Sequence, residues 1–176
     1  LDRDRCKLRK CYSLYRRLML SLGTGSSPTI SDMANQTFYV FDGSDQEITP
    51  HSSVVTTIAN AVTASSVEFS ISAWFKIDNV SASRVLFKLF KNGVSTDQLL
   101  LIYHASANEM RFSSKFNNVN DLCQQGTNSI EGDGNWHHVI GTCSSTDNTT
   151  ELWIDGNKVD DNTTGVGTPS VTFDTV

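Results

Sequence analysis

Apolar and polar residues alternate over residues 69–76, where the chain runs Phe-Ser-Ile-Ser-Ala-Trp-Phe-Lys. Because successive side chains of a β-strand point to opposite faces, this alternation predicts a strand with one face in a core. The apolar face carries Phe69 and every second residue up to Phe75. Trp74 is therefore expected on the opposite face of the same strand.

Two further stretches, 85–90 and 99–103, are apolar on both faces. Strands covered on both sides are typical of the middle of a two-sheet sandwich. Residues 110–112 indicate a weaker strand, and polar turn signals separate the stretches. We therefore expect an all-β fold of two packed antiparallel sheets, with no helix longer than about two turns between residues 37 and 176.

Residues 1–22 have a helical pattern instead. Their apolar side chains recur at helical spacing, at Leu8, Tyr12, Tyr15, Met19 and Leu22. This predicts a basic amphipathic helix, and the Gly- and Ser-rich stretch 23–28 predicts a linker. We divide the chain into a helical segment at 1–30 and a β-domain at 31–176. We expect this helix either to pack on this or a neighbouring domain, or to bind a membrane surface or the groove of a partner protein. Contact with a membrane is expected only through such flanking segments.

The formal net charge of −5 is unevenly distributed. The first 20 residues hold seven basic and two acidic side chains, a balance of +5 that leaves −10 for the rest. An acidic main domain excludes nucleic acid as the expected partner. The sequence contains no run of 18 apolar residues, so we expect no membrane-spanning segment.

Sequons for N-glycosylation and four cysteines indicate an exported protein, at the cell surface or outside the cell. The sequons, all in predicted loops or at strand ends, are at Asn35, Asn79, Asn148 and Asn162. We expect at least two of them to be exposed and glycosylated, Asn148 first.

Cys123 and Cys143 are the only cysteines in the predicted β-domain. We expect them to form a disulfide, which would stabilise the fold by about 3 kcal/mol. The pairing of Cys6 and Cys11 is left open.

Four short stretches follow one another along the β-domain. They are 38–43 (Phe-Tyr-Val-Phe-Asp-Gly), 69–76, 136–139 (Trp-His-His-Val) and 152–156 (Leu-Trp-Ile-Asp-Gly). In this order they resemble the laminin-G-like branch of the concanavalin A-like lectin and glucanase jelly rolls, over residues 36–176. The resemblance implies a jelly-roll sandwich in an extracellular multidomain protein. It also implies a closing strand that nothing after residue 171 resembles, so we expect an open sheet edge, filled by the precursor's continuation or an assembly neighbour.

The resemblance also implies a calcium ion at the sandwich rim, which many members carry. The loop acids that could bind it are Asp42, Asp45, Asp121 and Asp147. No ligand motif matches, so the metal site stays unassigned. No cofactor is required, and calcium remains open.

Catalysis is not expected. Retaining glycoside hydrolases of this superfamily need two carboxylates on one strand face, and the only candidate, Glu-Gly-Asp at 131–133, lies in a Gly-rich turn. His137 and His138 are neighbours in an extended segment, so their side chains diverge and cannot bind one metal ion.

We therefore expect an adhesion or recognition module that binds proteins or glycans through loops or a sheet face, beside neighbouring modules of its precursor or assembly. One alternative is a carbohydrate-binding lectin, with Trp74, Trp153 and Tyr103 as the stacking residues. Two further alternatives are a glycoside hydrolase remnant, which a carboxylate pair facing one cleft would support, and a structural module of a filament or cell coat, which an unpaired edge would support.

Overall fold

The computed structural model describes residues 29–33, 36–42, 46–63, 66–77, 81–91, 93–117, 119–124, 133–169 and 173. The chain divides into two compact units, Leu1–Val54 and Val55–Val176. The helix expected over residues 1–22 lies outside the described residues, so it and the expected domain boundary at residues 30 and 31 stay predictions. No helix among the residues described is long and apolar enough to cross a bilayer.

The first unit contains a short two-stranded ribbon. Strands β1 (Thr29–Met33) and β2 (Gln36–Val40) pair antiparallel, with Thr29 opposite Val40 and Met33 opposite Gln36.

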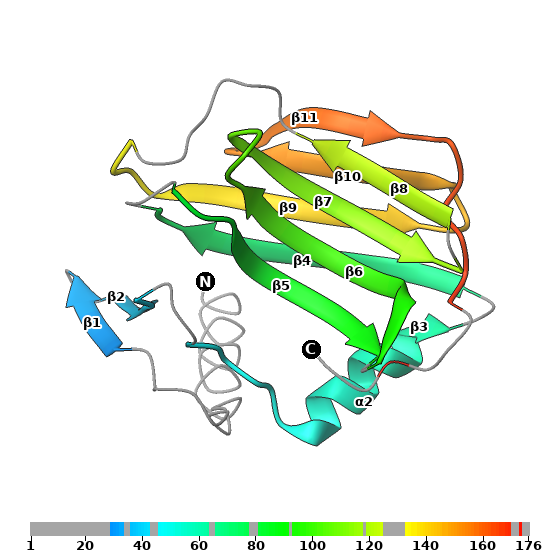
Figure 1. Cartoon of the computed structure of the whole chain (residues 1–176), viewed down its shortest axis with the longest axis horizontal. Helices are drawn as coiled ribbons and strands as arrows, with labels where there is room; N and C mark the ends of the chain where they lie inside the picture. Colours follow the sequence, from blue (N-terminus) through cyan, green and yellow to red (C-terminus); the bar gives the residue numbers. More distant parts are fainter. Residues whose placement is uncertain are drawn as a thin grey trace, which may run out of the picture. The chain divides into compact units, whose positions relative to one another are not determined.

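The second unit is a sandwich of two antiparallel sheets (Figure 1). The five-stranded sheet has the order β11-β10-β9-β4-β3, and the four-stranded sheet has the order β5-β6-β7-β8. The strands of the first sheet are β3 (Val62–Thr63), β4 (Ser66–Phe75), β9 (His137–Ser144), β10 (Thr149–Ile154) and β11 (Asn157–Asn162). Those of the second are β5 (Arg84–Lys91), β6 (Val94–His104), β7 (Glu109–Phe116) and β8 (Val119–Gln124). The predicted all-β sandwich is confirmed.

Two-residue alternation places the core between the sheets. In β9, His137, Val139, Gly141 and Cys143 are buried and the residues between them are half-buried. The facing strands of the other sheet supply large side chains without any exposed surface, such as Leu99 and Phe112. The phenyl rings of Phe69 and Phe87 stack across the sandwich with their centroids 5.4 Å apart.

The two sheets approach each other closely at Gly141. A Cβ atom added there would lie 2.5 Å from Cδ2 of the Phe112 ring. The glycine therefore makes room for a buried aromatic ring, and only hydrogen at this position lets the two layers close.

One helix departs from the prediction. Helix α2 (Ser52–Ala61) has 10 residues, nearly three turns, where we expected none longer than two. Its β-branched residues have weak helix propensity, but burial of Val55 and Ala59 and packing of Ile58 against the core override that preference. The Nδ1 atom of His51 accepts a hydrogen bond from the Ser53 backbone N–H at 3.3 Å, which caps the first turn.

Side chains join the two sheets where β11 lies beside β8. Oδ2 of Asp160 accepts a hydrogen bond from the Gln124 backbone N–H at 2.8 Å, and Nδ2 of Asn162 donates to the Leu122 carbonyl at 3.4 Å. The open edge expected from the end of the sequence stays a prediction, because residues 170–172 and 174–176 lie outside the described residues.

Candidate functional site

The side of the five-stranded sheet that faces away from the core is here called the outer face. Strand register assembles it from three strands: Trp74 pairs with His138, Ser70 with Thr142, and Thr142 with Glu151. It consists of Glu68, Ser70, Ser72 and Trp74 from β4, His138, Ile140, Thr142 and Ser144 from β9, and Thr149, Glu151 and Trp153 from β10.

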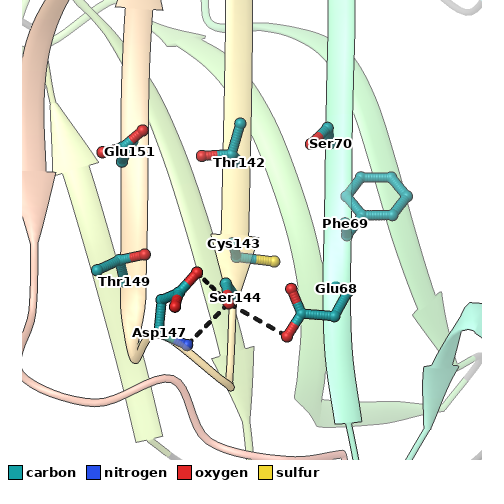
Figure 2. A pocket seen from close by; sticks show the side chains of 9 residues that line it. All are labelled: Glu68, Phe69, Ser70, Thr142, Cys143, Ser144, Asp147, Thr149 and Glu151. Atoms are coloured by element: carbon teal, nitrogen blue, oxygen red, sulfur yellow. Dashed lines mark hydrogen bonds between the residues drawn. The ribbon is translucent and has the colours of Figure 1, made fainter.

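A depression of about 440 Å³ opens on this face (Figure 2). Its lining residues are Glu68, Phe69, Ser70, Thr142, Cys143, Ser144, Asp147, Thr149 and Glu151. Hydroxyl and carboxylate groups dominate this lining, so the depression is suited to a ligand with many hydrogen-bonding groups.

A serine hydroxyl links two carboxylates in the depression. Oγ of Ser144 lies 3.1 Å from Oε1 of Glu68 and 3.3 Å from Oδ2 of Asp147, as Figure 2 shows. The Thr146 backbone N–H also donates to Oε1 of Glu68 at 3.2 Å. Hydrogen bonds from the side chain and backbone of Thr146, together with that from Ser144, lower the pKa of Glu68 despite some desolvation. Glu68 is therefore a carboxylate acceptor at neutral pH.

The third carboxylate, Glu151, positions an aromatic ring. Its Oε2 accepts a hydrogen bond from Nε1 of Trp153 at 3.0 Å, and its Oε1 lies 3.4 Å from Nζ of Lys158. The half-buried indole of Trp153 is thus held against the outer face beside the depression.

Trp74 is the most exposed aromatic residue of the outer face, with 66% of its surface accessible. Its ring stacks on the imidazole of His138 with centroids 4.9 Å apart and planes tilted by 24°. Nε2 of His138 lies 2.7 Å from Oγ of Ser72, which fixes the imidazole in turn. The indole is thus a supported platform whose other face is open to solvent.

Of the three predicted stacking residues, the structure excludes one. Tyr103 has no exposed surface, and its hydroxyl donates to Oδ1 of Asn108 at 2.9 Å inside the protein. The prediction for Tyr103 was wrong because Tyr103 lies on the core-facing side of β6, with Leu99 and Leu101, whereas the residues between them are half-buried. Trp74 and Trp153 both lie on the outer face. Trp74 pairs with His138 of β9, and Trp153 pairs with Ile140, the next outer-face residue of the same strand.

His137, buried at the start of β9 on its core-facing side, is held between two aspartates. Its Nδ1 lies 2.7 Å from Oδ2 of Asp155, and its Nε2 lies 3.1 Å from Oδ2 of Asp133. Burial alone would lower the pKa of His137, but the hydrogen bonds and charges of Asp155 and Asp133 outweigh it, so the pKa is raised. A neutral imidazole has one N–H and can satisfy only one carboxylate, whereas imidazolium satisfies both. As the sequence predicted, His137 and His138 point to opposite sides of β9.

This Asp-His-Asp clamp has a defined pH dependence. Because the pKa of His137 is raised on folding, protonation of His137 stabilises the fold. This contribution is fully present below pH 6.5, the ordinary pKa value, and is lost as the pH rises through the pKa of the folded state. Hydrogen bonds from Asn135 lower the pKa of Asp133, and those from His137 and His138 lower the pKa of Asp155 against desolvation. The aspartate contributions are therefore present above the ordinary value of 3.8 and lost as pH falls through the folded values.

The predicted disulfide is absent: Cys123 and Cys143 are buried free thiols. The two residues belong to different sheets, and Sγ of Cys123 donates instead to the Thr150 carbonyl at 3.0 Å. Burial, with smaller effects of nearby carboxylates, raises the pKa of each thiol to about 12. Both are therefore small core residues with little thiolate character.

The loop acids proposed for calcium have different surroundings. Asp121 is fully buried, and its Oδ2 accepts a hydrogen bond from Oγ1 of Thr150 at 2.6 Å. Asp147 is bonded to Ser144, Asp42 is exposed in the first unit, and Asp45 lies outside the described residues. Within the described ranges, no three His, Cys, Asp or Glu side chains come together as metal ligands.

The sequons differ in their surroundings. Asn148 is exposed, whereas Asn162 is half-buried and its Oδ1 accepts a hydrogen bond from the Thr164 backbone N–H at 2.9 Å. Asn35 and Asn79 lie outside the described residues. Glycosylation at all four positions stays a prediction.

The described strands define the class of two-sheet antiparallel β-sandwich domains, and the sequence shows to which superfamily of that class the chain belongs. The sequence profile described as "Concanavalin A-like lectin/glucanases superfamily" matches residues 42–176, and the chain belongs to this superfamily. The resemblance to the laminin-G-like branch is thereby confirmed. Among curated proteins, none has a significantly similar sequence.

Solved structures share the fold. The CBM40 domain of the Ruminococcus gnavus IT-sialidase superimposes with a TM-score of 0.54 at 12% identity, over 68% of this chain and 65% of that chain. The same domain bound to α2,3-sialyllactose gives a TM-score of 0.51 at 11% identity, over 61% of each chain. Domains LG4–5 of the mouse laminin α1 chain give 0.45 at 14% identity, over 62% of this chain and 27% of that chain. The match spans less than two thirds of each of these structures.

Proposed function

We propose that this protein is a carbohydrate-recognition module that binds an extended glycan across the outer face without hydrolysing it. The observation that carries the proposal is the exposed Trp74, stacked on His138, on the same sheet face as the polar depression. Of the functions expected from the sequence, this corresponds to the lectin alternative.

The arrangement matches the two surfaces of a sugar ring. The C–H face of a pyranose is apolar and packs on a flat aromatic ring, while its hydroxyl groups hydrogen-bond to carboxylates and hydroxyls. Trp74 would supply the first contact. The six residue-to-residue steps along β4 from Glu68 to Trp74 span about 20 Å, which suits a chain of sugar rings better than a single one.

The carboxylates of the depression support binding without hydrolysis. Glu68 and Asp147 do face one depression, the arrangement that a hydrolase remnant would show. The general acid of a glycosidase needs a raised pKa, however, whereas hydrogen bonds lower the pKa of Glu68. With its pKa lowered, Glu68 is a carboxylate at neutral pH and is suited to accept hydrogen bonds from a ligand.

The superfamily and the sequons support an extracellular or cell-surface site of action, which we include in the proposal. A role in adhesion, with neighbouring modules of the same precursor, follows if the glycan belongs to another cell or to a matrix. In the similar Ruminococcus gnavus domain, the bound glycan is sialyllactose.

The experiment compares Trp74→Ala with the unmodified protein in affinity electrophoresis against xylan, mannan, galactan and mixed-linkage β-glucan. Removal of a central aromatic contact should weaken binding of the retained polysaccharide about tenfold or more. The matched control is Val85→Ala, an exposed apolar residue (56%) of the four-stranded sheet, which should leave binding unchanged. Equal retention of Trp74→Ala and Val85→Ala would contradict the proposed surface.

A further inference from the structure

The depression of the outer face carries charge of one sign. Three of its lining residues are carboxylates, Glu68, Asp147 and Glu151, and none of its lining residues is cationic. Lys158 reaches Glu151 from β11, but its Nζ is also paired with Asp161 at 3.5 Å.

The three carboxylates are oriented by donors of the protein itself. Ser144 bonds to Glu68 and Asp147, and Trp153 bonds to Glu151 at 3.0 Å. An ionised carboxylate offers about four acceptor sites, so these contacts leave others for a ligand. Such groups accept hydrogen bonds from uncharged hydroxyls and repel other anions.

We propose, resting on the glycan-binding function above, that the depression selects uncharged, hydroxyl-rich sugar units and rejects anionic ones. A sialic acid, uronic acid or sulfated sugar entering it would meet Glu68, Asp147 and Glu151 together. At a separation of about 6 Å in a water-like dielectric, each carboxylate lowers the affinity for a ligand anion about threefold, and more where water is displaced. The proposed ligand is therefore uncharged, unlike the sialylated glycan bound by the similar sialidase domain.

Calorimetry with paired ligands tests this selection. The probes are a neutral hexose tetramer, chosen from the polysaccharide that the protein retains, and the uronic acid tetramer of the same linkage. The unmodified protein should bind the neutral tetramer at least tenfold more tightly. The double variant Asp147→Asn, Glu151→Gln should reduce that ratio about tenfold, because two like charges are removed.

Two controls separate charge from shape. Asp160→Asn removes a carboxylate whose oxygen bonds to the Gln124 N–H at the sheet edge, outside the depression, and it should leave the ratio unchanged. Raising the salt concentration from 10 to 500 mM, values of our choice, should lower the ratio of the affinity for the neutral tetramer to that for the anionic tetramer in the unmodified protein. The same change should have less effect on that ratio in the double variant.

The outcomes are distinguishable from failure of the function itself. Equal affinity for both tetramers, or a ratio that the double variant does not change, would overturn charge selection while glycan binding stands. Failure of the protein to bind any neutral glycan would overturn the proposed function and the charge selection with it.

Discussion

Replacing Gly141 with alanine should destabilise the sandwich, although alanine in a strand would ordinarily be the more stable residue. Without a clash, Gly→Ala stabilises a compatible site by about 0.4–1 kcal/mol through the unfolded state. The new Cβ would lie 2.5 and 2.6 Å from two atoms of the Phe112 ring, far inside ordinary contact distance. Phe112 is fully buried, so the ring can move only if its neighbours do. Such overpacking costs about 1–3 kcal/mol, which outweighs the gain.

Urea and thermal unfolding measure the effect. A net loss of about 1–2 kcal/mol should lower the Tm by roughly 2–8 °C for a domain of this size. The double variant Gly141→Ala, Phe112→Leu should lose less than the sum of the two single losses, because the smaller side chain accommodates the methyl group. Stability of Gly141→Ala at or above that of the unmodified protein, or additive losses, would refute this account of the sheet contact.

The remaining predictions concern titration, thiols and export. The free energy of unfolding should fall as the pH rises through the raised pKa of His137. His137→Gln should weaken this pH dependence, whereas the control His51→Gln should not. The same pH dependence in His137→Gln and in the unmodified protein would contradict the clamp. Cys123 and Cys143 should resist thiol labelling at pH 8 until the protein unfolds, because burial raises their pKa to about 12; rapid labelling of folded protein would show that they are accessible. Protein from a secretory host should carry a glycan at Asn148, seen as a mass shift after glycosidase treatment, and an unshifted mass would count against export.

The sandwich could be predicted because period-two alternation is a local property of the chain. Over 69–76 it assigned the core face of β4 and placed Trp74 on the other face, where its exposure is 66%. Helix α2 was missed because Val and Thr favour strands locally, and only the burial of Val55 and Ala59 in the assembled core decides otherwise.

The candidate site was predicted only in its aromatic part. Tyr103 carried no local signal of its burial. It shares the core face of β6 with Leu99 and Leu101, but residues 99–103 are all apolar or aromatic, so their pattern does not show which face is buried. The depression is assembled by the register of β4, β9 and β10, which bring Glu68 and Glu151 to one face. Pairing between strands far apart in sequence has no local signature, so no pattern could predict that cluster. The disulfide prediction was wrong for the same reason, because sequence spacing does not show whether two cysteine side chains meet in the folded sandwich.

The most direct test of glycan binding at the outer face is a map of the contact itself. Nuclear magnetic resonance of labelled protein, titrated with the neutral tetramer, reports which residues meet the ligand. We predict the largest shift changes at the indole N–H groups of Trp74 and Trp153 and at the backbone amides of His138, Thr142 and Glu151, all on this face. Shift changes confined to the four-stranded sheet, or to the first unit of the chain, would contradict the account.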